Sequence, residues 1–76
     1  MEKQEAPLFE IFYHQNDYAR LISAFESLEQ AEMLVKNILP GFCKVTKSKI
    51  KQPYVSINTP TYAEGVMFQM FFCKNR

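Results

Sequence analysis

The chain has few of the residues that build most catalytic and metal sites. Its 76 residues include one histidine, two cysteines, two glycines and no tryptophan. Because a phosphate-binding loop needs several closely spaced glycines, Gly41 and Gly65 do not form one. The spacing of His14, Cys43 and Cys73 matches no structural zinc pattern. We therefore expect no enzyme, no metal, no cofactor and no small-molecule substrate.

The histidine and the cysteines also have ordinary structural explanations. His14 comes near the end of a predicted strand, so a surface position is expected. Cys43 and Cys73 lie among apolar neighbours, and a buried cysteine usually behaves as a small hydrophobic residue. A disulfide between them requires their two strands to pair side by side. Since no secretory signal is recognised, we expect both thiols to be reduced.

Long apolar runs are also missing from the chain. No segment reaches the roughly 20 apolar residues that a membrane helix needs. The first seven residues are polar and acidic, so we expect no signal peptide and a cytoplasmic location. With 47% hydrophobic and 22% charged residues, a packed domain is expected rather than disorder. We predict a single domain over residues 1–76, with a flexible tail over residues 1–7.

One segment, residues 27–39, has the end signals of a complete helix. Ser27 stands at the N-cap position and Gln30 follows three residues later, which is the pattern of a capping box. Pro40 and Gly41 then end the helix. At about 100° per residue, one arc collects the apolar side chains of Leu28, Ala31, Leu34, Val35, Ile38 and Leu39. The helix therefore has a single apolar face, which covers one surface.

The rest of the chain changes to the residue pattern that is typical of strands. Strands are predicted over residues 8–14, 18–25, 42–50, 54–57 and 66–74, with a hairpin loop at 15–17 and a turn-rich loop at 58–65. The order ββαβββ indicates an α+β domain, in which a single helix packs on an antiparallel sheet of four to five strands. The run Ala24–Glu32 resembles a strand-to-helix junction of small bacterial and phage proteins, and this resemblance implies no activity.

The first and the last predicted strands are apolar on both faces, as strands buried on two sides are. One helix with one apolar stripe covers only one face of the sheet, so the other face needs a second cover. A second copy of the chain, another protein, the curling of the sheet on itself, or sheet twist with the 58–65 loop could supply it. We predict a protein–protein interaction or accessory domain that forms a homodimer or binds another protein. The expected interface residues are Leu8, Phe12, Met67 and Phe71.

Charge is divided unevenly between the two halves of the chain. Residues 1–38 carry three basic against seven acidic residues, a net charge of −4, while residues 39–76 carry six against one, a net charge of +5. Lysines at every second position from 47 to 51 would line one face of the third strand. Lysines beside aromatic residues can follow a phosphate backbone and stack on bases. The alternative prediction is therefore nucleic-acid binding through Lys44, Lys47, Lys49, Lys51 and Tyr54.

The same lysines have a simpler explanation. Lysine on an edge strand prevents edge-to-edge aggregation of sheets. The chain contains no recognised nucleic-acid-binding motif, and Arg20 and Arg76 are its only arginines. Protein binding is therefore the preferred interpretation.

Overall fold

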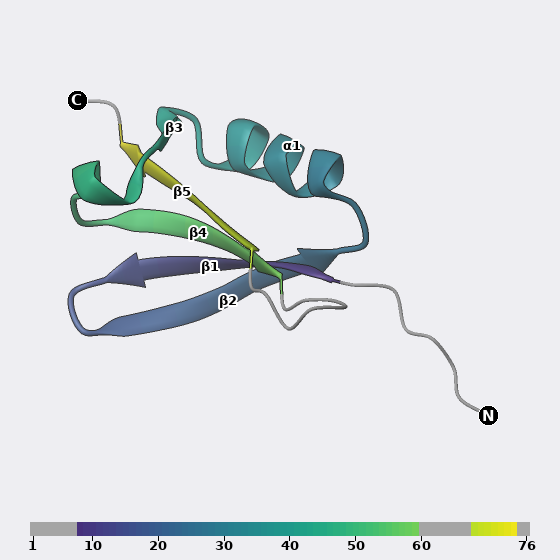
Figure 1. Ribbon diagram of the computed structural model, residues 1–76, viewed down its shortest axis with the longest axis horizontal. Coiled ribbons are helices and arrows are strands. Elements are labelled where there is room, and N and C mark those ends of the chain that lie inside the picture. The colour runs from purple at the N-terminus through teal and green to yellow at the C-terminus, as the bar shows by residue number, and fades with distance from the viewer. Residues whose placement is uncertain (1–7, 60–67, 75–76) are drawn as a thin grey trace.

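The structure is a computed structural model that describes residues 8–59 and 68–74. Five strands form one antiparallel sheet, and a single α-helix of the described residues covers one of its faces (Figure 1). The elements in chain order are β1 Phe9–Gln15, β2 Tyr18–Phe25, α1 Leu28–Ile38, β3 Phe42–Val45, the short 3₁₀ helix η1 Lys47–Lys49, β4 Tyr54–Thr59 and β5 Phe68–Lys74. The predicted α+β fold and its ββαβββ order are confirmed.

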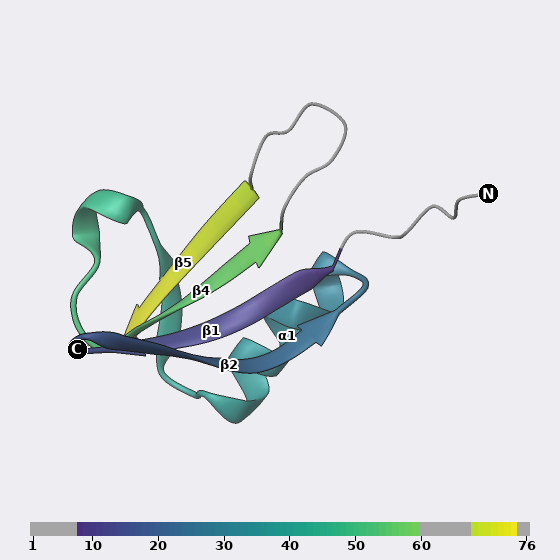
Figure 2. The same cartoon turned by 90° about the horizontal axis from the view of Figure 1, so that it is seen from below.

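The order of strands across the sheet is β2-β1-β4-β5-β3. The two edge strands, β2 and β3, are consecutive along the chain, and α1 carries the chain from one edge to the other (Figures 1 and 2). No helix among the described residues is long and apolar enough to span a bilayer.

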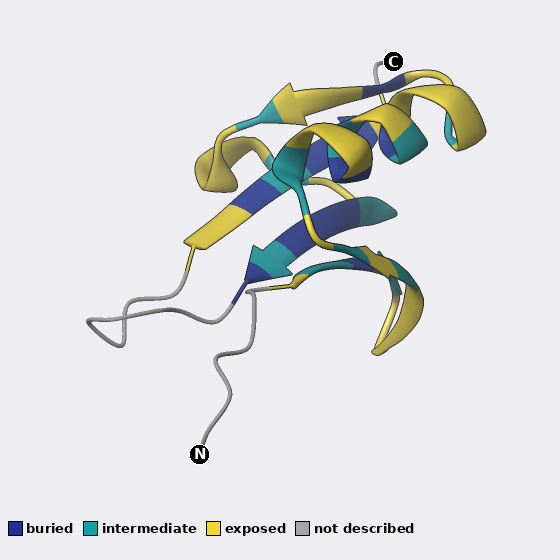
Figure 3. Ribbon diagram, turned by 90° about the vertical axis from the view of Figure 1, so that its right-hand side faces the viewer, coloured by how far each residue is buried: buried dark blue, intermediate teal, exposed yellow. Residues whose placement is uncertain are grey.

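The core lies between α1 and the sheet. Strand register places Ile11 opposite Ile57 and Tyr13 opposite Val55, so alternate residues of β1 and β4 face the helix. Ile11, Val55 and Ile57 are completely buried. From α1, Ala31 and Val35 pack against them without solvent exposure, as the predicted apolar face requires. Burial is therefore concentrated in the central strands and on one side of the helix (Figure 3).

The ends of α1 agree with the sequence-based expectation. The Gln30 N–H donates to Ser27 Oγ at 3.2 Å, which satisfies one backbone donor of the first turn. Gly41 follows the helix with a φ of 95°, a conformation that glycine adopts without steric cost. Ile38, which was expected on the apolar face, is 58% exposed, whereas Leu39, the C-cap residue, is partly buried against the core.

The third strand is shorter than predicted, and this prediction was wrong. β3 ends at Val45 instead of Ile50, and Lys47–Lys49 form η1. The reason is topological, because β3 pairs with β5 while β4 lies on the far side of β5. The chain must leave the sheet to pass β5, so the lysines at 47, 49 and 51 do not line a strand face. β4, in contrast, extends to Thr59 rather than 57.

Some sequence-based expectations lie outside the described residues. These are the tail at 1–7, the start of the last strand at Val66 and Met67, and most of the loop at 58–65.

A β-bulge interrupts the pairing of β1 with β2. Ile11 is opposite Ser23, whereas Phe12, the next residue, is opposite Leu21. Ile22 is therefore the extra residue of β2. Beyond a bulge the alternation of side chains continues with the opposite parity, so Tyr18 and Arg20 lie on the same face as Ser23 and Phe25.

Candidate functional site: the sheet face opposite the helix

The sheet face that α1 does not cover carries a group of aromatic rings. Register places Phe12 opposite Ser56 and His14 opposite Tyr54, while Ser56 also lies opposite Phe71 on β5. Paired residues of antiparallel strands share a face, so these side chains lie together on the side away from the helix. Together, Phe12, His14, Tyr54 and Phe71 form the aromatic cluster.

The rings of the aromatic cluster pack on one another in sequence across the sheet. The His14 and Tyr54 rings are parallel, with their centroids 4.2 Å apart and an interplanar angle of 2°. The ring centroids of Phe12 and His14 are 6.4 Å apart, and those of Phe71 and Tyr54 are 6.2 Å apart. All four residues are half-buried. The cluster is thus an ordered apolar surface rather than four separate exposed rings.

A polar contact lies beneath the rings. His14 Nε2 is 2.9 Å from Ser56 Oγ, and Ser56 is only 2% exposed. Burial lowers the pKa of His14, because the charged ring loses solvation. His14 is half-buried, so it lies at the surface as expected but with part of its ring covered. The contact with the buried Ser56 hydroxyl fixes the orientation of the His14 ring.

The uncovered face is not apolar throughout. At the end formed by the last residues of β4, Gln69 Nε2 donates to Asn58 Oδ1 at 3.1 Å, and Glu10 lies opposite Asn58. The apolar part of this face is therefore limited to the aromatic cluster and its neighbours. The polar side chains of Glu10, Asn58 and Gln69 therefore mark one boundary of the apolar surface.

At the opposite end, the segment that follows β3 covers part of the face. The backbone N–H of Lys51 donates to Cys73 Sγ at 3.1 Å, and Cys73 is buried. Cys43 lies directly opposite Cys73, so the strands pair side by side as a disulfide would require. Both thiols are free, and Cys43 is exposed, contrary to the expectation of two buried cysteines.

The structure brings together two of the four predicted interface residues. Phe12 and Phe71 both belong to the aromatic cluster, on either side of Ser56. Leu8 precedes β1 and is 42% exposed, and Met67 lies outside the described residues.

Sequence reasoning missed Leu21. This residue of β2 is opposite Phe12 and is 54% exposed, so it extends the aromatic cluster to the edge of the sheet. Its signal in the sequence is a strand, residues 18–25, whose only charged residue is Arg20. Strict alternation along β2 would place Leu21 on the same face as Ser23 and Phe25. The bulge at Ile22 reverses this, so that Leu21 lies on the face opposite the helix.

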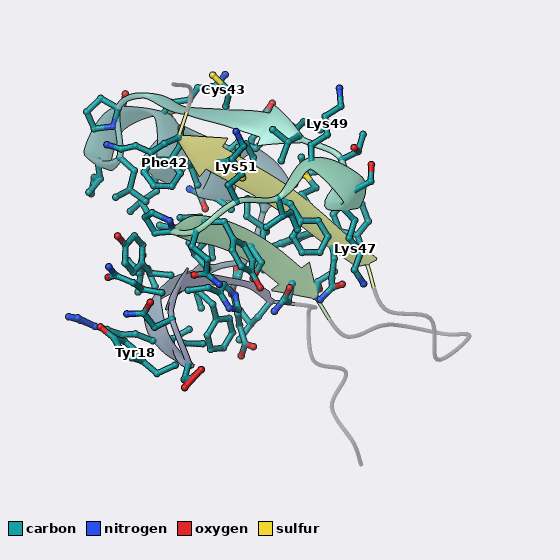
Figure 4. The ribbon with its side chains drawn as sticks, turned by 90° about the vertical axis from the view of Figure 1, so that its left-hand side faces the viewer. Tyr18, Phe42, Cys43, Lys47, Lys49 and Lys51 are labelled. Atoms are coloured by element: carbon teal, nitrogen blue, oxygen red, sulfur yellow. The ribbon has the colours of Figure 1, made fainter. Side chains whose placement is uncertain are left out.

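The predicted nucleic-acid residues do not form one line. Lys44, opposite Phe72, is on the helix side of the sheet, whereas Lys47 and Lys49 belong to η1. Figure 4 shows Lys47, Lys49 and Lys51 spread over the surface around η1 and the segment that follows it. Tyr54 has one ring face occupied by His14, which leaves less of the ring for stacking on a base.

A hollow lies beside these lysines. It has a volume of about 420 Å³ and is lined by Val45, Ser48, Lys49, Ile50, Lys51, Cys73 and Lys74. Three of the seven lining residues are lysines, so the hollow favours anions.

Comparison with protein-family models, with curated proteins and with solved structures gives no match. Within residues 8–59 and 68–74, no three histidine, cysteine, aspartate or glutamate side chains come together as a metal site would need.

Proposed function

We propose that the chain is a non-enzymatic protein-binding domain that self-associates, or docks on another protein, through the sheet face opposite α1. One observation carries this proposal. The aromatic cluster continues across the sheet into Leu21, whose side chain is 54% exposed. Aromatic residues are enriched in protein interfaces and contribute much of their binding energy.

Sedimentation equilibrium at micromolar concentrations tests this proposal. The wild-type chain is expected to form dimers, and Phe71→Gln is expected to weaken them, because it replaces an aromatic contact by a polar amide. Phe68→Gln is the matched control, since Phe68 is on the same strand but on the helix side. Circular dichroism verifies that each variant is folded. A wild-type chain that is monomeric throughout would overturn self-association, and a dimer equally weakened by both variants would overturn the role of this face.

Nucleic-acid binding is a second candidate function, supported by the hollow beside Lys49, Lys51 and Lys74. Binding of a labelled oligonucleotide should then weaken steeply as salt increases, because counterions are released from the phosphates. Replacing Lys49 and Lys51 by Gln should reduce the salt dependence. The control is Lys36→Gln, a change of the same kind on α1. Absence of binding at low salt would eliminate this candidate.

A further inference from the structure

Among the residues that the structure describes, the outer edge of β2 pairs with no strand. β2 has eight residues, and its one described neighbour in the sheet is β1. In the view from below, no described element lies in front of it (Figure 2). Tyr18, Leu21 and Ile22 along this edge are 57%, 54% and 37% exposed, respectively. Long edge strands with exposed apolar side chains readily pair with another strand.

The other edge is protected. β3 has only four residues, includes Lys44, and is followed at once by η1 with Lys47 and Lys49. Shortness, lysine and a break in the strand are recognised means of preventing edge-to-edge pairing. β2 lacks lysine and proline, its only charged residue is Arg20, and the bulge at Ile22 is its one protective feature. The two edges of the same sheet therefore differ sharply in their readiness to pair.

We propose that β2 pairs antiparallel with β2 of a second copy of this chain, so that the two sheets join into one. The row of unpaired N–H and C=O groups selects an extended strand as the partner. A second copy is the partner that this asymmetry favours, because pairing of like edges closes as a two-fold dimer. Pairing of β2 with β3 would instead continue into a filament, and the protected β3 edge opposes it.

This inference rests on the proposed function only in that the chain acts by binding protein. It concerns a different surface, the backbone edge of β2 rather than the aromatic cluster.

The bulge restricts the register of such a dimer. An antiparallel pair related by a two-fold axis perpendicular to the sheet keeps each face on its own side, so opposed residues must share a face. Tyr18, Arg20, Ser23 and Phe25 lie on the helix side, while Ala19, Leu21 and Ala24 lie on the other. The register that pairs all of β2 and respects these faces sets Tyr18 opposite Phe25, Ala19 opposite Ala24, and Arg20 opposite Ser23. It also keeps Arg20 away from its own copy, avoiding repulsion of like charges.

In this arrangement both helices lie on one side of the joined sheet. Both aromatic clusters lie on the other side, and the two Leu21 side chains meet near the axis. The dimer would thus present one continuous apolar surface.

Sedimentation equilibrium of an edge variant is the first test. Ile22→Lys places a charge at the centre of the open edge and should weaken the dimer on the order of tenfold or more. Met33→Lys is the control, because Met33 is also an exposed apolar residue, at 54%, but lies on the outer side of α1. A dimer of unchanged strength in Ile22→Lys would overturn the inference.

Cross-linking tests the register and does not depend on the folding of the lysine variant. Ala19→Cys and Ala24→Cys are prepared separately, each with Cys43→Ser, and are mixed and oxidised with diamide, which accepts the two electrons and two protons of the thiols. Directly opposed Cα atoms lie about 4.5–5.5 Å apart, within the range that a disulfide spans. We expect the mixed disulfide to form in preference to either homodimer. A mixture that gives no preferential mixed product would overturn this register.

The Ile22→Lys and Phe71→Gln variants distinguish pairing through the β2 edge from association through the aromatic cluster. Loss of the dimer in Ile22→Lys but not in Phe71→Gln supports edge pairing and overturns the proposed role of the aromatic cluster in self-association. The reverse result overturns edge pairing and leaves the proposed function intact. A monomeric wild-type chain overturns both forms of self-association.

Discussion

The His14 ring is stacked on the Tyr54 ring at 4.2 Å, while its Nε2 atom lies 2.9 Å from Ser56 Oγ. This single side chain therefore ties β1 to β4 by both an aromatic and a polar contact. Both contacts are available to the neutral ring, whose Nε2 can accept the serine proton or donate to the serine oxygen. The protonation state of His14 thus affects the joint between the N-terminal hairpin and the rest of the sheet.

We expect the free energy of unfolding to fall as the pH is lowered from about 8 to about 5. Burial holds the pKa of His14 in the folded chain below its ordinary value of 6.5, so the unfolded chain binds the proton more readily. The stability that depends on the neutral ring is fully present above the unfolded-state pKa, and it is lost as the pH falls from there through the lower folded-state pKa. Urea unfolding at several pH values measures this loss. His14→Gln should show a smaller decrease, and an identical decrease in both proteins would contradict the prediction.

Cys43 and Cys73 should form a disulfide within one chain when oxidised with diamide. They are direct register partners and both are free thiols, so their backbones already have a spacing that a disulfide tolerates. Two protons and two electrons pass to the diamide as the sulfur–sulfur bond forms. Thiol titration under denaturing conditions should detect the loss of both thiols. Persistence of both thiols, or accumulation of dimers linked through the exposed Cys43, would contradict the expectation.

Ser27→Ala should destabilise the chain by about 1 kcal/mol, because the Gln30 N–H loses its acceptor at the start of α1. Ser48→Ala is a suitable control. Ser48 also makes a hydrogen bond, to Thr46 Oγ1 at 3.1 Å, but in an exposed turn, so a change below about 0.5 kcal/mol is expected. Urea unfolding gives both values. Equal losses of unfolding free energy in Ser27→Ala and Ser48→Ala would contradict a stabilising role of the Ser27 cap.

Gly41→Ala should destabilise by about 1–2 kcal/mol. A Cβ added at this position meets no atom within 4 Å, so the cost is one of backbone strain at a φ of 95° rather than of collision. Gly41→Asn should cost less, since asparagine adopts positive φ more readily than alanine. Thermal unfolding can rank the three proteins. Equal stability of the alanine variant and the wild-type chain would refute the strain at this turn.

Features set by neighbouring residues were predictable from the sequence. The N-cap at Ser27, the end of the helix before Gly41 and the presence of a hairpin turn after β1 all depend on local chemistry. The turn is one residue shorter than the predicted loop at 15–17, because Gln15 pairs with Tyr18. The alternation in β1 also predicted that Phe12 and Ile11 face opposite sides. These signals sufficed for the fold class and for part of the candidate site.

The remaining features depend on contacts between distant residues. Lys47 and Lys49 have the spacing of a strand, but the position of β5 between β3 and β4 requires a crossover there. The contact of His14 with Ser56 joins residues 42 positions apart, and no local pattern encodes it. The exposure of Leu21 was hidden by the bulge, which no glycine or proline signals in β2.

The path of α1 across the sheet has a kinetic consequence. β1 and β2 form a local hairpin, but β1 must find β4, and β3 must find β5, at large separations along the chain, as in the pairs of Glu10 with Asn58 and Phe42 with Lys74. Closing such long loops is slow, and sheets with mostly non-local pairings fold on a timescale of roughly milliseconds to seconds. The hairpin of β1 and β2 is therefore expected to form before β1 pairs with β4. During that interval both of its edges are unpaired, so the yield of folded chains should depend on protein concentration during refolding.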